Sequence, residues 1–359
     1  MRKIVINGAN GYVASHFIQK LLDRNYKVDT FVRDGKKILA ADRMKAVLYE
    51  INNDNNRKDD HLKVYNYSLL EEDYLLPHNH LEQIFNGKID FFHFAACLKY
   101  HLKDRDEIFN TNVNGLENSI KTFLKYSGPA SRFFFISTVY SCGYFPELFE
   151  EKFYDNESIE RFRNYYEQSK RIAENIVRQY TERKGLNGYV IRLSQVAGNN
   201  ISGVTVTEYG VFDFVKRVQK FSGRYPNSTI RIRANPNATQ NLISIDNVVN
   251  YLMKATCTPQ LPAIIHFAGK NPVKNDQIIK CICEHLPITL IQDNTLEKKN
   301  MNAKERILAL GMSFTGGYTN TDLHISTRNL DKYFSPDGNE VNEESLRKMI
   351  RYFIKNHNE

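Results

Sequence analysis

Tyr166 and Lys170 stand four residues apart in the stretch NYYEQSKRIA, residues 164–173, whose pattern is typical of a helix. Residues four apart lie on the same face of a helix, so this phenol and this ammonium can face one cleft. A free phenol has a pKa of about 10, and a nearby cation favours its ionised form. Such a pair can donate or accept a proton near neutral pH.

A solvated helix face is the competing interpretation, because the chain contains 21 tyrosines. The amino-terminal stretch of the chain favours a catalytic role for the Tyr166–Lys170 pair over a solvated helix face. Lys3–Asn7 is a short apolar run, followed by Gly8-Ala-Asn-Gly11-Tyr-Val-Ala14 and an amphipathic stretch. Gly8 suits a sharp turn, and Gly11 lets the backbone approach a pyrophosphate at the helix N-terminus. The pattern predicts a dinucleotide site built from Gly8, Asn10, Gly11, Tyr12 and Val13.

The second apolar run ends in Arg33-Asp34. An acidic residue at this point commonly binds the ribose 2′-hydroxyl, whereas an arginine accommodates a 2′-phosphate. Arg33 comes first, and Arg43 could add a second contact, so we expect NADP (as NADPH) rather than NAD. Solvation of Lys36 and Lys37 in the same stretch is an open alternative to a binding role.

Six short apolar runs alternate with helical stretches, which predicts an α/β fold, a doubly wound parallel sheet of Rossmann type. The runs cover 3–7, 27–32, 62–67, 89–96, 132–136 and 189–193. The fourth run ends in Ala95 and Ala96, where the backbone could pass close to a cofactor. Thr138 follows the fifth, at the sheet edge where such folds bind ligands. We expect His93, inside an apolar run, to be a core histidine.

Two longer helical patterns belong to this part of the chain. The helix predicted over 158–184 carries Tyr166 and Lys170. The helix predicted over 105–126 is interrupted by Asn112, and an asparagine inside a helix indicates a specific hydrogen-bonding role for its side chain.

From Ser194 onward the alternation ends, and Gly, Thr, Asn and Pro become frequent. We therefore expect residues 1–195 to form an NADP-binding Rossmann domain, joined by returning segments near 241–256 and 263–268. A smaller, interleaved substrate-binding portion on the C-terminal side would comprise residues 196–240 and 269–359.

The net charge of +8 and pI near 9.0 favour a phosphate-bearing ligand or an acidic partner. Nucleic acid is not expected, because the aromatic residues follow apolar strand patterns and do not cluster with basic residues. Five cysteines without a C-x-x-C pair argue against a disulfide framework or a metal site. No apolar run reaches about 18 residues, so we expect a cytoplasmic protein without a membrane segment, as a monomer or homodimer.

Taken together, the motifs resemble the extended short-chain dehydrogenase/reductase family. They are the glycine turn, His93-Phe-Ala-Ala96, Asn112-Val-Asn-Gly115, Ser137-Thr138 with Gly143, Tyr166-x-x-x-Lys170 and Arg192-Leu-Ser-Gln-Val-Ala-Gly198. Within that family the chain looks most like the thioester reductase and fatty acyl reductase (male sterility-like) branch. This is carried by ISTVY at 136–140, NYYEQSK at 164–170, Gly198 with Ser202-Gly203, and NLISIDNV at 241–248.

The resemblance implies a role for each matching residue. Tyr166 would be the proton donor or acceptor, and Lys170 would lower its pKa and hold the nicotinamide ribose. Thr138 would hydrogen-bond the substrate oxygen, and Asn112 would support a water linked to Lys170. Two positions depart from the family: Asn66-Tyr67-Ser68 replaces the usual Gly-Asp that contacts adenine, and Ser194 replaces a common proline.

We therefore expect an NADPH-dependent reductase of an acyl thioester, linked to CoA or to an acidic acyl or peptidyl carrier protein, that releases an aldehyde or alcohol. Thr138 and Tyr166 would stabilise the developing oxyanion. A nucleotide-sugar epimerase or dehydratase is an alternative, although Val139-Tyr140 replaces the acidic pair of dehydratases. Two further alternatives are a simple ketone or aldehyde reductase and an NADP-sensing binding protein without turnover.

Overall fold

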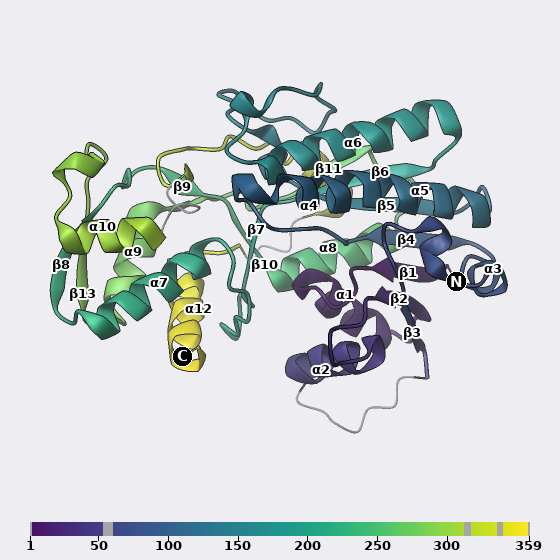
Figure 1. The fold of residues 1–359 in the computed structure, drawn as a ribbon, viewed down its shortest axis with the longest axis horizontal. Helices are drawn as coiled ribbons and strands as arrows, with labels where there is room; N and C mark the ends of the chain where they lie inside the picture. The colour runs from purple at the N-terminus through teal and green to yellow at the C-terminus, as the bar shows by residue number, and fades with distance from the viewer. Residues whose placement is uncertain (1, 53–59, 312–316, 336–339, 358–359) are drawn as a thin grey trace.

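A seven-stranded, all-parallel sheet forms the centre of the computed structural model, which describes residues 2–52, 60–311, 317–335 and 340–357. The strand order is β11-β6-β5-β4-β1-β2-β3 (Figure 1). The strands are β1 Lys3–Asn7, β2 Val28–Val32, β3 Leu62–Asn66, β4 Ile89–His93, β5 Arg132–Thr138, β6 Gly188–Leu193 and β11 Ile264–Phe267. The predicted doubly wound fold is confirmed. The order reverses between β1 and β4, and ligands bind at the carboxyl ends of strands near such a reversal.

Helices cover both faces of the sheet. One face carries α1 Tyr12–Asp23, α2 Ala40–Asn52 and α8 Ile245–Cys257; the other carries α3 His78–Ile84, α5 Gly115–Tyr126 and α6 Tyr165–Lys184. Side chains of β1 alternate between the two layers, with Ile4 and Ile6 in the first core and Val5 in the second. Because both faces are covered, β1, β4 and β5 are buried along nearly their whole length, and such strands are visible in the sequence as apolar runs. β3, at the edge of the sheet, has no buried residue.

The helix predicted over 105–126 is divided. α4 Arg105–Phe109 leads into a single π-helical turn, Asn110–Asn114, before α5 begins. The predicted helix over 158–184 also begins later than expected, at Tyr165. Asn164 is the N-cap of this helix: its side chain accepts a 3.0 Å hydrogen bond from the backbone N–H of Glu167. Such a cap marks the point at which a helix begins.

A second, smaller lobe lies beside the sheet (Figure 1). It contains α7 Val211–Arg224, α9 Asn275–Cys283, α10 Ala303–Gly311 and α12 Glu343–Asn356, with β8 Ser228–Ile232 parallel to β13 Ile288–Gln292. Two further pairs join β7 Gln195–Ala197 to β10 Leu242–Ser244, and β9 Thr239–Gln240 to β12 Val273–Lys274. Single-turn helices cover Glu72–Leu75, Leu102–Asp104, Val139–Cys142, Ile159–Arg161 and Lys298–Asn300.

The segments expected to return from the lobe behave differently from one another. β11 joins the main sheet beside β6, as expected, and α8 packs on α1. β10, by contrast, pairs with β7 and, among the described strands, is not part of the main sheet. α11 Arg328–Phe334, within the range assigned to the substrate-binding portion, packs on β11, and its Leu330 and Phe334 belong to the core of the main sheet. The roles assigned to the two portions remain predictions.

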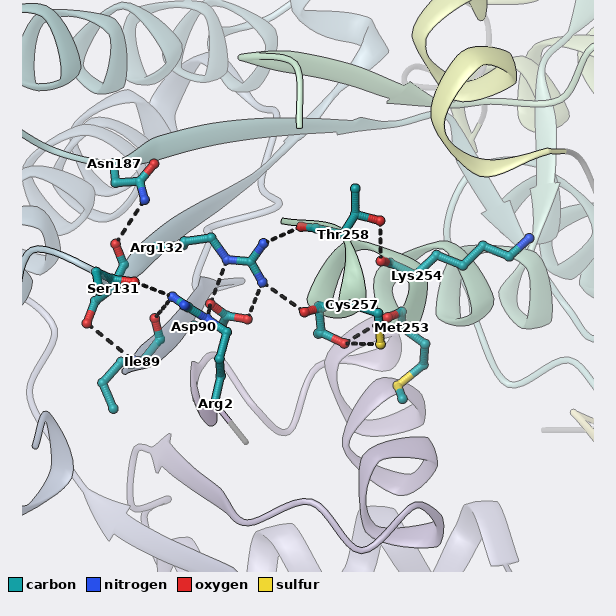
Figure 2. A network of polar contacts seen from close by, with 12 residues as sticks. Arg2, Ile89, Asp90, Ser131, Arg132, Asn187, Met253, Lys254, Cys257 and Thr258 are labelled. Carbon is teal, nitrogen blue, oxygen red and sulfur yellow. Dashed lines mark hydrogen bonds and ion pairs between the residues drawn. The ribbon is translucent and has the colours of Figure 1, made fainter. Parts of the chain in front are cut away.

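A buried ionic network closes the amino-terminal edge of the sheet, opposite the ligand-binding edge (Figure 2). Asp90 of β4 accepts hydrogen bonds from Arg132 of β5 at 2.8 and 2.5 Å, and from Arg2 at 2.5 Å. Arg132 also donates to the carbonyl oxygens of Thr256 and Thr258 at the end of α8. The network ties two strands to a covering helix.

No helix within the described ranges is long and apolar enough to cross a membrane.

Candidate active site

A cavity of about 550 Å³ opens at the carboxyl ends of the strands, between the sheet and the smaller lobe. The structure brings most of the predicted site residues to its wall: Gly8, Asn10, Gly11, Tyr12, Val13, Ala96, Thr138, Tyr166 and Lys170. Arg33, Arg43, Ala95 and Asn112 are not part of this wall. The lobe contributes apolar side chains from α7, β8 and α9, including Phe214, Ile232 and Ile279.

The glycine turn forms one wall of the cavity. Gly8 has a φ of +61°, and a Cβ there would lie 2.6 Å from the backbone nitrogen of Ala95. Ala95 is thus the backbone against which the turn packs, fixed by a 3.1 Å hydrogen bond from its N–H to the Asn7 side chain. Gly11 precedes α1, whose first turn contains no acidic residue. The turn therefore fits a pyrophosphate, which favours exposed N–H groups at a helix N-terminus.

We expect Gly8→Ala to weaken dinucleotide binding. An L-residue in this backbone conformation costs about 1–2 kcal/mol, and the Cβ would also push the Ala95 backbone out of place. Cofactor affinity, measured by NADPH fluorescence titration, should fall at least about tenfold. Gly128→Ala is the matched control, because a Cβ there meets nothing within 4 Å. Wild-type affinity in Gly8→Ala would contradict this account of the turn.

Arg33 and Arg43 lie together after β2. The Arg43 guanidinium donates to the carbonyl oxygen of Arg33, while the Arg33 side chain is exposed. One carboxylate oxygen of Asp34 accepts a 2.7 Å hydrogen bond from the backbone N–H of Ala40 at the start of α2. The two arginines, like the exposed Lys36 and Lys37, are cationic groups of the segment that follows β2.

Tyr166 and Lys170 extend from the first turns of α6 toward the cavity. Lys170 Nζ donates to the carbonyl oxygen of Ile136 at 3.0 Å and lies 5.9 Å from the centroid of the Tyr166 ring. Burial lowers the pKa of Lys170 to about 8, although the charge of Glu174 raises it. Burial, and next the charge of Glu167, raise the pKa of Tyr166 above its ordinary value.

This arrangement differs from the prediction that Lys170 lowers the pKa of Tyr166. The ammonium is directed to a strand carbonyl rather than to the phenol, and the Tyr166 side chain is half-buried in the cavity wall. Partial burial disfavours the charged phenolate, which is the cause of the raised pKa of Tyr166. The role of Tyr166 as proton donor or acceptor remains a prediction.

Thr138 and its neighbours are held by a buried network that the sequence did not reveal. Thr138 Oγ1 donates to the Leu193 carbonyl and accepts from the Tyr140 N–H, both at 3.2 Å. Ser137 donates to Glu174 at 2.6 Å, and Glu174 forms a 2.7 Å ion pair with the fully buried Arg192. The sequence did contain an indication of this network. Glu174 and Arg192 are charged residues within apolar helix and strand patterns, and a buried charge requires a partner inside the protein.

Asn112 lies in the π-helical turn, and its amide is fully engaged. It accepts from the Cys97 N–H at 2.7 Å and donates to the Cys97 carbonyl at 3.1 Å and to Ser169 Oγ at 2.9 Å. The side chain thereby joins the loop after β4 to α6, one residue before Lys170. The structure places Asn112 behind the site rather than in its wall.

The two departures from the family pattern have local explanations. The N–H of Ser194 donates to the Phe267 carbonyl at 2.9 Å and extends the pairing of β6 with β11, which a proline could not do. Tyr67 turns inward into an aromatic cluster with Phe31 and Tyr74, and burial raises its pKa to about 12. Tyr67 therefore packs beneath the glycine turn instead of offering a carboxylate to adenine.

Several cavity residues were not predicted, among them Gln195, Tyr140 and Tyr318. Tyr140 packs edge-to-face on Tyr318, with ring centroids 5.1 Å apart. Tyr318 comes from a segment without a recognisable motif. Among the described residues, no group of three or more His, Cys, Asp or Glu side chains could hold a metal ion.

The family model described as male sterility protein, an NAD-binding family, matches residues 6–252. The chain belongs to this family. It is an NAD(P)-dependent oxidoreductase of the extended short-chain dehydrogenase/reductase type, as the motifs predicted. A search of curated proteins finds no match.

Solved structures share this fold over nearly the whole chain. The terminal R domain of the myxalamid PKS-NRPS pathway has a TM-score of 0.79 at 15% identity, covering 99% of this chain and 91% of that one. A thiolation-reductase di-domain from an archaeal non-ribosomal peptide synthetase has a TM-score of 0.76 at 20% identity, with coverages of 99% and 75%. The UDP-glucuronic acid 4-epimerase of Bacillus cereus, with NAD, has a TM-score of 0.67 at 14% identity, with coverages of 98% and 96%. At these identities the likeness establishes the fold.

Proposed function

We propose that this enzyme is an NADPH-dependent reductase that converts an acyl thioester, linked to CoA or to a carrier protein, into an aldehyde or alcohol. The observation that carries the proposal is the convergence of Thr138, Tyr166 and Lys170 on a cavity that the glycine turn also lines. A carbonyl group in this cavity would face a hydroxyl, a phenol and a bound dinucleotide at once.

Each residue has a role in this reaction that follows from its surroundings. Bound NADPH supplies a hydride to the carbonyl carbon. The Tyr166 phenol donates a hydrogen bond to the oxygen on which negative charge develops, where such donors have the largest effect. The Thr138 hydroxyl is a second donor to this oxygen once its single hydrogen turns away from the Leu193 carbonyl. Tyr166 then provides the proton, which its raised pKa keeps in place until the oxygen becomes basic. The resulting hemithioacetal collapses to the aldehyde: its C–S bond breaks, and the thiol leaves with the proton of the hydroxyl group. Lys170 holds the ribose beside this oxygen.

The thioester is preferred over a nucleotide sugar for three reasons. The wall contributed by the lobe is mainly apolar, through Val211, Phe214, Ile232, Ile278 and Ile279, which suits an acyl chain better than a sugar diphosphate. Val139-Tyr140 stands where dehydratases have an acidic pair. The net charge of +8 also suits the acidic surface of a carrier protein.

NADPH oxidation followed at 340 nm tests the proposal. The panel comprises an acyl-CoA, an acyl-phosphopantetheine, a medium-chain aldehyde and a sugar nucleotide. Thioester-dependent oxidation with release of free thiol is the expected result. Turnover of the aldehyde alone would restrict the enzyme to carbonyl reduction, and conversion of the sugar nucleotide would replace the proposal with an epimerase or dehydratase.

We expect the double variant Arg33→Ala, Arg43→Ala to lose NADPH affinity while keeping its affinity for NADH. Each guanidinium that contacts a 2′-phosphate contributes a charge-assisted hydrogen bond, so the combined loss should be about tenfold to hundredfold. Titration of wild type and variant with both coenzymes gives the ratio of their affinities for NADPH and NADH. Lys45→Ala, an exposed residue of α2 with no assigned role, is the control. Equal losses for NADH and NADPH would show that the arginines do not select the coenzyme.

Coenzyme binding should weaken as the pH rises through about 8, where the buried Lys170 loses its proton. The lysine is charged below that pH and neutral above it, because burial lowers its pKa. Loss of one charge-assisted hydrogen bond to the ribose should cost about tenfold in affinity. Lys170→Arg should remove this pH dependence between pH 7 and 9, because a guanidinium stays protonated there. A wild-type profile that is flat in this range would argue against the assigned role.

A further inference from the structure

Tyr318 lies between α10 and α11, outside the residues 6–252 that match the family, yet it lines the cavity. Its phenol donates a 2.6 Å hydrogen bond to Oε1 of Glu167 and accepts a 3.1 Å hydrogen bond from Nδ2 of Asn164. A residue about 150 positions away in the sequence thus reaches the first turn of α6.

Asn164 and Glu167 are the residues that begin α6, and Tyr166 lies between them. The Asn164 side chain caps the helix by accepting the Glu167 N–H. Glu167 is completely buried, and Oε2 accepts a 3.0 Å hydrogen bond from the backbone N–H of Arg163. The carboxylate therefore depends on Arg163 and Tyr318 for its hydrogen bonds, and the position of this turn depends on both.

Tyr318 also contacts the element that carries Thr138. Its ring packs edge-to-face on Tyr140 at 5.1 Å, and the N–H of Tyr140 donates to Thr138 Oγ1. The Arg163 guanidinium lies between the rings of Tyr318 and Tyr144, 5.0 and 4.9 Å from their centroids. One side chain thus bridges the two elements that present the hydroxyl and the phenol to the cavity.

We propose that Tyr318 is a positioning residue that fixes Tyr166 relative to Thr138, an inference that rests on the proposed reductase function. Two hydrogen-bond donors can act on one oxygen only while their separation is held, and displacement of a reacting group by about 1 Å can cost about hundredfold in rate. Without the Tyr318 hydroxyl, the buried Glu167 carboxylate loses its shortest hydrogen bond and the first turn of α6 is free to shift.

Tyr318→Phe tests this proposal, because it removes the hydroxyl and keeps the ring in the cavity wall. We expect kcat to fall about tenfold to hundredfold, the effect of a hydrogen bond to a charged group, while KM for the thioester changes less than about threefold. Glu167→Gln should reproduce the loss, and the double variant should lose little more than either single variant. Tyr144→Phe is the matched control, since it contacts the same guanidinium from outside the cavity, and should behave as wild type.

Hydrogen exchange gives a readout that needs no turnover. Backbone amides in the first turn of α6 should exchange about tenfold faster in Tyr318→Phe than in wild type or Tyr144→Phe. A raised KM with unchanged kcat would make Tyr318 only a wall for the substrate, and unchanged exchange would overturn the proposal. If the wild type reduces aldehydes but no thioester, the proposed function fails while the kinetic comparison still applies with the aldehyde; if it reduces neither, the exchange rates decide.

Discussion

Tyr166→Phe should lose about 10²- to 10⁴-fold in kcat, the range typical for removal of a general acid. The phenol is the only group changed, and phenylalanine fills the same space, so the fold and the cavity should be retained. The pKa of Tyr166 lies above its ordinary value because the group is partly buried, which makes its proton available only to a strongly basic oxygen such as a developing alkoxide. Removing the hydroxyl therefore removes both the proton and one of the two donors to that oxygen.

Single-turnover measurements with saturating NADPH separate this effect from coenzyme binding. We expect coenzyme affinity to change less than about threefold, because Lys170 and the glycine turn remain in place. Tyr165→Phe is the matched control: it is the preceding residue of the same helix, packs on Phe109 and does not line the cavity. A Tyr166→Phe enzyme with a near wild-type rate would assign proton transfer to another group and would refute the proposed mechanism.

Asp90→Asn should lower the free energy of unfolding by about 3–5 kcal/mol, the cost of breaking a buried ion pair by removing one charge. Asp90 is completely buried and accepts from two guanidinium groups, of which that of Arg132 is itself buried. The variant leaves both cations without their counter-charge, and loosens the contact of β5 with the carboxyl end of α8.

Urea unfolding followed by circular dichroism measures this loss. Asp106→Asn is the control, because its ion pair with Arg105 is exposed and should contribute less than about 1 kcal/mol. Coenzyme affinity should be unchanged in the folded Asp90 variant, since the network lies at the opposite edge of the sheet from the cavity. A loss of stability no larger than that of Asp106→Asn would show that the pair is not needed.

The sequence was sufficient to predict the main sheet and the glycine turn. Parallel strands covered on both faces are continuous apolar runs, so β1 was predicted at Lys3–Asn7, where the structure has it. Gly8 was predicted because a sharp turn between a strand and a helix restricts the residue type, and the structure shows the left-handed backbone that requires it. These properties depend on neighbours within a few residues.

Partners distant in the chain decided the rest. The pKa of Tyr166 could not be predicted from Lys170 alone, because burial by the whole fold outweighs one cation that is engaged by Ile136. β10 carries a strand pattern that cannot specify which strand it joins, and in the structure that partner is β7. Tyr318 has no motif, since its role depends on reaching Glu167 across about 150 residues.

The sequence by itself thus determined the family, the order of the strands along the chain and the residue types at the carboxyl edge of the sheet. The tertiary structure decided which of those residues share the cavity, which hydrogen bonds they retain and whether their protons are held or released. The physical reason is that backbone conformation and apolar periodicity are local, whereas burial and hydrogen-bond partners are created only when distant segments pack together.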